Sequence, residues 1–270
     1  MRAAVLALAC VALGGCGSRE ARIHRSLERL VPGGAIMLAG VRADKLRDTP
    51  GWSTRGQSLM RPALRDEAAA RDAGIDLDRD IDEMLAVWDG VHFLAFARGR
   101  FEGHTGERIG AGEGSAIFLD ESTLVAGSRE DVAWVLSHRG RMPGPPAALR
   151  RLMGELPADS QAWLVAMGGR APDVRGNAAN FAQVLTAAES VWAAVRFDKD
   201  ARFSAEISAK SAQEAARLND GLIALAALAR LSAGDAAVAK AIEGIRIERR
   251  DRVVAVEAVL TPEQVDGFVR

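Results

Sequence analysis

Apolar and polar positions alternate along the chain in a way that predicts short strands separated by helices. In the first half, apolar and β-branched runs predict strands at 35–41, 115–119 and 123–126, and one or two strands within 87–101. Residues 53–72 have the composition of a helix, which Pro62 interrupts. A further helix is expected to begin at Ser128, because Ser128 and Asp131 have the spacing of a capping box.

The second half repeats this succession of elements. Its patterns predict strands at 161–167, 190–197 and 202–210, a helix near 180–189, a long helix from Ser211 and a strand pair within 244–260. Thr261 then begins a terminal helix. Its apolar residues Val265, Phe268 and Val269 have the same offsets from Thr261 as Val132, Val135 and Leu136 have from Ser128.

These patterns predict an α+β fold of two tandem, similar units, each an antiparallel sheet with helices packed on one face. Residues 139–147 are rich in Pro and Gly, which interrupt both helix and sheet, so we place the boundary there. The predicted division is a signal peptide at 1–15, a lipidated tether at 16–30, a first unit at 31–138, a linker at 139–150 and a second unit at 151–270.

The amino terminus has the pattern of an exported protein. Arg2 precedes an apolar stretch, 3–13, which is too short to span a bilayer because a span needs about 20 apolar residues. The stretch ends in the tetrapeptide Leu13, Gly14, Gly15, Cys16, which resembles the bacterial lipobox. The resemblance implies that signal peptidase recognises Leu13, Gly14 and Gly15 and cleaves before Cys16, and that acyl chains are attached to Cys16.

A lipid on Cys16 implies that a membrane is the first partner of this protein. The residue directly after the cysteine, Gly17, is not Asp. In this respect the chain resembles lipoproteins that are sent on to the outer membrane, so we expect the body to face the periplasm. The chain has two cysteines, Cys10 and Cys16. Because Cys10 leaves with the signal peptide, the mature protein is expected to contain no disulfide bond.

Composition narrows the range of partners further. The chain is 49% hydrophobic and 26% charged, which is ordinary for a globular protein. Its formal net charge is −1, and the basic residues are spread evenly among the acidic ones. We therefore expect no nucleic acid partner, since nucleic-acid-binding surfaces carry clustered Lys and Arg.

The densest group of carboxylates is Asp76, Asp78, Asp80, Asp82 and Glu83. The group resembles a calcium loop at first sight, but Ile81 and Val87 occupy the positions where an EF-hand requires Gly and Glu. An acidic first turn of a helix, favoured by the helix dipole, explains the same residues. A weak cation site of another kind is the alternative.

Glycines and histidines offer no stronger site. The segment 103–114 is rich in Gly but lacks GK[ST] and precedes a strand, so we interpret it as a hairpin loop and as the first choice for a partner-binding surface. Histidines occur at His24, His92, His104 and His138, without the short spacing of a zinc site. The sequence predicts no metal site, no cofactor and no catalytic residue.

Residues 221–231 are apolar on nearly all faces of the expected helix. The segment is too short to span a bilayer, and a helix buried between the sheet and a neighbouring unit is the main interpretation. Insertion into a membrane and the lining of a lipid-binding groove are the alternatives.

The body of the chain also resembles uncharacterised bacterial lipoproteins and secreted proteins. The matching segments are GIDLDRDID at 74–82, ARGRF at 97–101 and FLDESTLVAGS at 118–128. The resemblance supports the fold and implies no activity. We therefore predict a lipid-anchored cell-envelope protein that serves binding or assembly, with a protein of the envelope as a candidate partner, and without catalysis. The alternatives are an envelope hydrolase with dispersed catalytic residues, placed near His104, and a carrier of a lipid or another apolar ligand.

Overall fold

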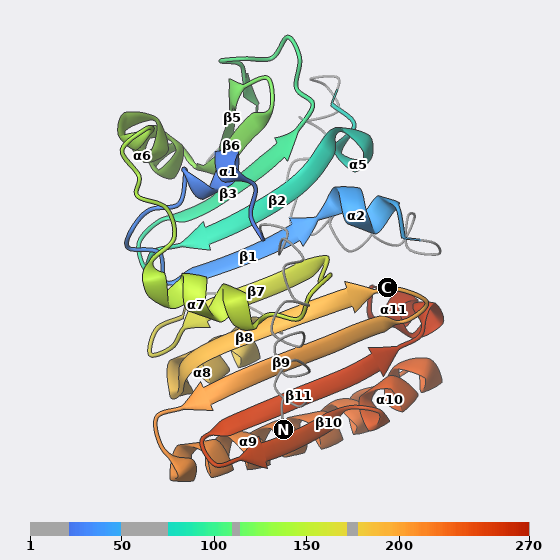
Figure 1. The fold of residues 1–270 in the computed structure, drawn as a ribbon. Helices are drawn as coiled ribbons and strands as arrows, with labels where there is room; N and C mark the ends of the chain where they lie inside the picture. Colours follow the sequence, from blue (N-terminus) through green and yellow to red (C-terminus); the bar gives the residue numbers. More distant parts are fainter. Residues whose placement is uncertain (1–21, 50–74, 110–113, 172–177, 270) are drawn as a thin grey trace, which may run out of the picture.

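The structure is a computed structural model that describes residues 22–49, 75–109, 114–171 and 178–269 (Figure 1). Within these ranges, eleven strands form one antiparallel sheet in the order β10-β11-β9-β8-β7-β1-β2-β3-β6-β5-β4. The strands are β1 (Met37–Arg42), β2 (Ile81–Trp88), β3 (Phe93–Gly99), β4 (Arg108–Ile109), β5 (Gly114–Asp120), β6 (Thr123–Ser128), β7 (Ala162–Met167), β8 (Ala188–Phe197), β9 (Ala201–Ala209), β10 (Arg246–Arg250) and β11 (Val253–Leu260). The α+β class with an antiparallel sheet is thus confirmed.

Nine helices of the described chain accompany this sheet. They are α1 (Arg25–Glu28), α2 (Ala43–Arg47), α5 (Leu77–Asp80), α6 (Arg129–His138), α7 (Ala147–Glu155), α8 (Ala178–Ala187), α9 (Ala212–Ser232), α10 (Ala236–Glu243) and α11 (Pro262–Val269). Ser128 forms the predicted capping box of α6 with Asp131, and Ser211 accepts the Glu214 N–H at the start of α9. The expected helix at 53–72 lies outside the described residues.

The two halves of the chain meet at the centre of the sheet. β1 pairs with β7 from Met37↔Ala166 to Val41↔Ala162, so the sheet is continuous across the predicted boundary. Outward from this pair, the strands follow as β1-β2-β3-β6-β5-β4 on one side and β7-β8-β9-β11-β10 on the other. Apart from the two-residue strand β4, the order is the same in both halves, while their independence as two units stays a prediction.

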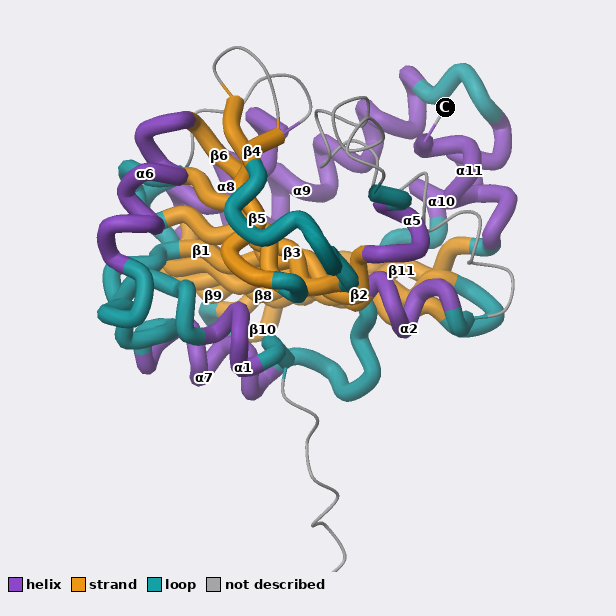
Figure 2. Tube along the Cα trace, turned by 90° about the horizontal axis from the view of Figure 1, so that it is seen from above, coloured by secondary structure: helices purple, strands orange, loops and turns teal. Residues whose placement is uncertain are grey.

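Helices cover both faces of the sheet, unlike the expected single face (Figure 2). On the face that we call the α7 face, Leu27 of α1, Val132 of α6 and Leu149 of α7 belong to one core cluster with Leu85 and Phe96 of the sheet. On the opposite face, the α9 face, the core cluster joins Leu185 of α8 and Ala215 of α9 to sheet residues that include Met37, Val191, Ile207 and Val254.

The cross-strand partners show why part of the α7 face can remain exposed to water. One row of partners crosses this face from β5 to β10 in the order Ile117, Val125, Phe96, Leu85, Gly40, Trp163, Ala194, Ser204, Glu257, Arg246. The row is apolar where α1, α6 and α7 contribute to the core and becomes polar on β9, β11 and β10. An antiparallel sheet can present one face to water, and this end of the α7 face is polar accordingly.

The α9 face differs, since its corresponding row is apolar across all ten strands. The row consists of Ala116, Ala126, Ala95, Ala86, Ala39, Leu164, Ala193, Ala205, Val256 and Ile247. The helices α8 and α9 pack on the second half of this face. Both faces together explain why the chain needs helices on either side of one sheet.

Three features of the chain differ from the sequence prediction: where α7 begins, the burial of the expected tether and the presence of α10. The helix α7 begins at Ala147, so the Pro/Gly-rich segment gives way to helix inside the expected linker 139–150. Ile23, Leu27 and Leu30 are buried in the core, although they belong to the expected tether 16–30. A separate helix, α10, follows α9 where no pattern predicts one, and Asp235 caps it by accepting the Ala237 N–H.

Candidate functional site

The predicted lipidation residue Cys16 and the recognition residues Leu13, Gly14 and Gly15 lie outside the described residues, which begin at Arg22. Arg22 is held by the body, because its Nη2 donates to the carbonyl oxygens of Leu156 at 2.7 Å and Pro157 at 2.6 Å. Five residues lie between Cys16 and Arg22, and the six Cα–Cα steps of this segment span at most about 20 Å. A lipid on Cys16 would therefore hold the body near the bilayer.

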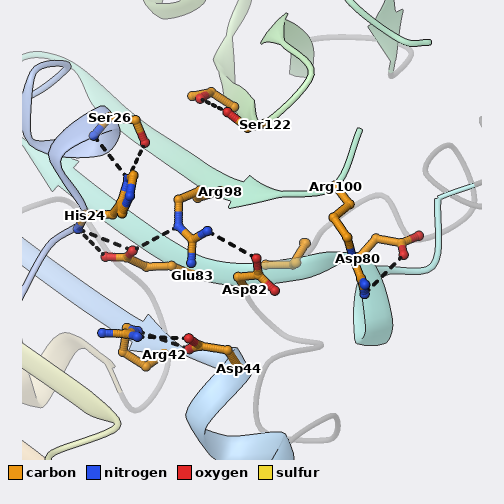
Figure 3. A network of polar contacts seen from close by, with 12 residues as sticks. His24, Ser26, Arg42, Asp44, Asp80, Asp82, Glu83, Arg98, Arg100 and Ser122 are labelled. Carbon is orange, nitrogen blue, oxygen red and sulfur yellow. Dashed lines mark hydrogen bonds and ion pairs between the residues drawn. The ribbon is translucent and has the colours of Figure 1, made fainter. Parts of the chain in front are cut away.

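A buried carboxylate, that of Glu83, binds the chain at His24, two residues after Arg22 (Figure 3). Glu83 is 3% exposed on β2, and its Oε1 and Oε2 accept the main-chain N–H of His24 at 3.1 and 3.3 Å. The Nε of Arg98 lies 3.5 Å from Oε2. Burial raises the pKa of Glu83, although the His24 N–H and the charges of Arg42 and Arg98 act to lower it.

The ion pairs around Glu83 form a network at the neighbouring ends of the strands β1, β2 and β3. Asp82 pairs with Arg98 at 3.2 Å and with Arg47 at 3.0 Å. Arg42 binds both carboxylate oxygens of Asp44, at 3.0 and 2.9 Å. Burial would raise the pKa of Asp44, but hydrogen bonds from the Arg42 side chain and the Lys45 backbone outweigh it and lower the pKa. In this network, three carboxylates face three guanidinium groups, so a structural role explains each of these charged residues.

The acidic cluster predicted from the sequence does not converge on one point. Asp76 is the N-cap of α5 and accepts the Asp78 N–H, while Asp80 accepts the Asp76 N–H. Asp82 and Glu83 belong to the network on β2. The acidic first turn is thus confirmed for α5 alone. In the described part of the chain, no group of three or more His, Cys, Asp or Glu side chains is placed to hold a metal ion.

The glycine-rich segment contains the short strand β4, which pairs with β5 from Arg108↔Ile117 to Ile109↔Ala116, while residues 110–113 of the expected loop lie outside the described residues. His104 bonds Glu107 at 2.7 Å and its ring lies 5.3 Å from that of Phe118. His24 bonds the neighbouring Ser26. Each of these two histidines thus bonds a residue close to it in the chain, which matches the scattered positions of the histidines.

A stack of three rings is not predicted by the sequence patterns. Trp134 of α6 lies between His92 and His138, with ring centroids at 4.5 and 4.6 Å. Asp89 bonds Nδ1 of His92 at 2.9 Å. The spacing of Trp134 and His138 by one helical turn is a signal for half of this stack. His92 comes from a hairpin 42 residues earlier in the chain, and no local pattern reveals its contact.

The second half of α9 carries four of the seven large apolar side chains that are exposed among the described residues. Its first half packs on the sheet through Ala215, Leu218 and Leu222. Beyond them, exposed apolar side chains project from the helix: Ile223 at 49%, Leu225 at 42%, Leu228 at 62% and Leu231 at 79%. We call these four residues the apolar surface of α9. The expectation that 221–231 is a buried core helix is therefore wrong.

Charge is nearly absent from this part of α9. Arg230 is the single charged residue within 221–231. Its guanidinium binds Glu243 of α10 at 3.1 Å, which ties the end of α9 to the next helix. None of the described helices combines the length and the apolar character that crossing a bilayer requires. Leu228 and Leu231 are three residues apart and lie on one side of α9, so this side is suited to contact with an apolar environment.

Comparisons with known proteins give information about the fold alone. No protein-family model matches the chain, and no curated protein is similar to it in sequence. The chain is similar in structure to crystal form I of TP0453, with a TM-score of 0.51 and 11% identity over 90% of this chain and 96% of that one. Crystal form III of TP0453 gives a TM-score of 0.53 and 10% identity over 90% and 97%.

Proposed function

We propose that this protein is a lipid-anchored cell-envelope protein that acts by binding rather than catalysis, and that the apolar surface of α9 is its second contact with the membrane. The anchor is the lipid on Cys16, at the outer membrane and facing the periplasm. The observation that carries the proposal is the exposure of Ile223, Leu225, Leu228 and Leu231 on a single helix end.

A bilayer is the apolar environment within reach of this surface. The short segment between Cys16 and Arg22 keeps the body close to the membrane. A helix that lies in the interface buries its apolar side by about 5–10 Å at the boundary between headgroups and acyl chains, and it needs no complete span. Complete burial of one fully exposed large aliphatic side chain is worth about 1.5–3 kcal/mol. Leu228 and Leu231, which are 62% and 79% exposed, have the most apolar area left to bury in such a contact.

Two other functions fit these observations less well. A carrier of an apolar ligand was expected to hold it between residues 221–231 and the sheet, yet Leu228 and Leu231 are exposed. A hydrolase near His104 would need further groups there, whereas His104 is bonded to Glu107 and packed near Phe118. A protein partner that covers α9 is the competing occupant, and the vesicle experiment separates it from lipid.

Leu231→Asp is expected to weaken membrane binding of the body. The assay uses residues 17–270, made without the signal peptide so that no acyl chain contributes, and measures sedimentation with vesicles of phosphatidylethanolamine and phosphatidylglycerol. Loss of one leucine removes about 1.5–3 kcal/mol of apolar burial. Since about 1.4 kcal/mol corresponds to a factor of ten, binding should fall at least about tenfold.

Val91→Asp is the matched control, because Val91 is 80% exposed on the β2–β3 hairpin and lies outside α9. It should leave vesicle binding unchanged. Equal binding by the unmodified body and Leu231→Asp would refute the membrane contact. The competing result is that the unmodified body does not bind vesicles but captures a protein from detergent extracts, and that Leu231→Asp abolishes this capture. That result would show that α9 binds a protein partner.

A further inference from the structure

We propose that Arg196 and Arg202, on the hairpin of β8 and β9, bind the phosphate of an anionic lipid headgroup and so direct this end of the sheet toward the bilayer. This inference rests on the proposed function, because it names the class of lipid that the anchored body meets. The hairpin adds a charged contact to the apolar contact through α9, and the two differ in the lipids to which they respond.

The two arginines face each other on neighbouring strands. Arg196 and Arg202 are direct cross-strand partners, and both side chains are exposed. They lie on the α7 face, because each is two positions along its strand from the partners Ala194 and Ser204. Like charges directly opposite each other destabilise a sheet, so this pair costs stability in the unbound protein.

No side chain of the described residues pairs with these two arginines. Neither guanidinium group forms a hydrogen bond or an ion pair within this part of the chain. The turn between the strands contains Asp198, Lys199 and Asp200, so the hairpin as a whole stays positive. The nearby Arg42 differs, since it is paired with Asp44. The arginine pair is therefore suited to an anion from outside the chain.

The geometry of the pair suits a phosphate group. Directly opposed residues of an antiparallel sheet have Cβ atoms about 4.5–5.5 Å apart, so two guanidinium groups can approach one anion from both sides. Each guanidinium presents parallel N–H donors that match the oxygen atoms of a phosphate. Val259 of β11 is the partner of Arg202 on its other side and is 51% exposed. Basic groups beside an exposed apolar side chain are typical of surfaces that lie at a bilayer interface.

The hairpin lies close to the start of the described chain. Gln161 fixes the end of β8, because its Nε2 donates to the Phe197 carbonyl oxygen at 2.9 Å and its Oε1 accepts the Phe197 N–H at 2.8 Å. Four residues earlier, the carbonyl oxygen of Pro157 accepts the hydrogen bond from Arg22. Four residues span at most about 14 Å, so Arg22 lies near Arg196. An anchored body therefore holds this hairpin near the headgroups.

A series of contacts also links the hairpin to the exposed end of α9. Arg230 ties the end of α9 to Glu243 of α10, and α10 contacts α11. Val265 of α11 packs with Phe197 and Ala201 of the hairpin. Figure 1 shows α10 and α11 at the strand end where β8 passes into β9. Contact of the apolar surface of α9 with a bilayer thus brings the hairpin close to the same bilayer.

Vesicle sedimentation of residues 17–270 tests the site by its dependence on lipid charge. Vesicles of phosphatidylethanolamine alone are compared with vesicles that also contain phosphatidylglycerol. One cationic side chain near an anionic surface strengthens binding about fivefold, so Arg196→Gln and Arg202→Gln should each lose about fivefold on the phosphatidylglycerol vesicles. Both variants should bind phosphatidylethanolamine vesicles as the unmodified body does. High salt should abolish the difference between the two kinds of vesicle.

Arg252→Gln is the matched control for the two substitutions. Arg252 is also an exposed arginine of the second half, but it lies at the opposite strand end, where its carbonyl oxygen accepts the Ala209 N–H at 2.8 Å. It should leave binding to both kinds of vesicle unchanged. Because Arg196→Gln and Arg202→Gln relieve a repulsion between exposed side chains, neither should lower the thermal unfolding temperature. A loss of binding would then not reflect a loss of folding.

Three results would overturn the headgroup site. The first is equal affinity of the unmodified body for both kinds of vesicle. The second is a preference for phosphatidylglycerol that survives both arginine substitutions, or that Arg252→Gln reduces as much. The third is that inorganic phosphate stabilises the unmodified body but not Arg202→Gln, while both kinds of vesicle are bound equally. That third result would assign the pair to a free anion.

Leu231→Asp distinguishes a failure of this inference from a failure of the proposed function. It should weaken binding to both kinds of vesicle, because the apolar surface of α9 does not depend on lipid charge. Unchanged binding of Leu231→Asp to phosphatidylethanolamine vesicles would count against α9 alone. A preference for phosphatidylglycerol that does not depend on Arg196 and Arg202 would count against the hairpin alone.

Discussion

Gly40→Val is expected to destabilise the protein by about 3 kcal/mol, at the upper end of the usual cost of overpacking. Gly40 lies on β1 directly opposite Trp163 of β7, where the two halves of the chain pair. A Cβ atom at Gly40 would come within 2.4 Å of Cζ2 of Trp163. Since both strands are central in the sheet, neither the ring nor the backbone has free space to yield. Urea denaturation measures the change.

Gly114→Val is the control for this substitution, because Gly114 also lies in a strand but has no atom within 4 Å of the position that a Cβ atom would take. It should change the free energy of unfolding by less than about 0.5 kcal/mol, as surface substitutions usually do. Trp163→Leu should restore part of the stability of Gly40→Val by making room. Equal costs at Gly40 and Gly114 would contradict the packing of Trp163 over the β1–β7 pair.

Cys16→Ser is expected to abolish stable membrane anchoring, or to block maturation of the precursor. Serine provides no thiol for the lipid, so the acyl chains and their contribution of about 0.8 kcal/mol per buried methylene are lost. Membrane fractionation and the mass of the amino-terminal peptide measure the effect. The proposed contact through α9 would be reversible, so a processed body without acyl chains should wash off the membrane, whereas the lipidated protein should not.

Cys10→Ser is the internal control, since Cys10 lies within the expected signal peptide. It should leave the mature mass and the fractionation unchanged. A Cys16→Ser protein of unchanged mass in the membrane fraction would show that the lipobox resemblance is misleading. The vesicle-binding results for α9 would then have to explain the localisation alone.

The class of fold can be predicted because most strands show local signals. Continuous apolar runs indicate β1, β7 and the middle of β8, and alternation indicates β9. The strand β2 is predicted only in part: the acidic residues before it favour a helix, yet Glu83, Leu85 and Val87 alternate with more exposed neighbours and point to one face, while a bulge separates them from Ile81. Asp82 and Glu83 obscure this period because charged residues are rare on the buried face of a strand.

The repeated ending of the two halves is only partly informative. Ser128 and Thr261 begin α6 and α11 with the same local spacing, but Val132 of α6 packs on the α7 face, while Val265 of α11 packs with Phe197 in another cluster. Local offsets predict a helix and its apolar side. Which face of the sheet the helix reaches depends on where the preceding strand ends, because successive strand residues point to opposite faces.

The apolar surface of α9 could not be placed from its sequence. An all-apolar segment is ordinarily buried, and the first half of α9 does pack on the sheet. The exposure of Leu228 and Leu231 depends on where α9 extends relative to the sheet, which the helix sequence does not encode. Glu83 likewise contacts His24 across 59 positions of the chain, and such a contact has no local signal.

One measurement tests most directly whether the anchored body rests α9 in the membrane. Since we propose that lipid occupies the thiol of Cys16 in the mature protein, Leu228→Cys is expected to provide a single free thiol for an environment-sensitive fluorophore. In vesicles, we predict a blue-shifted emission that lipid-borne quenchers reduce, and neither effect for the same fluorophore at Val91→Cys. Emission at position 228 that stays aqueous and unquenched, while Cys16 is lipidated, would contradict the membrane contact.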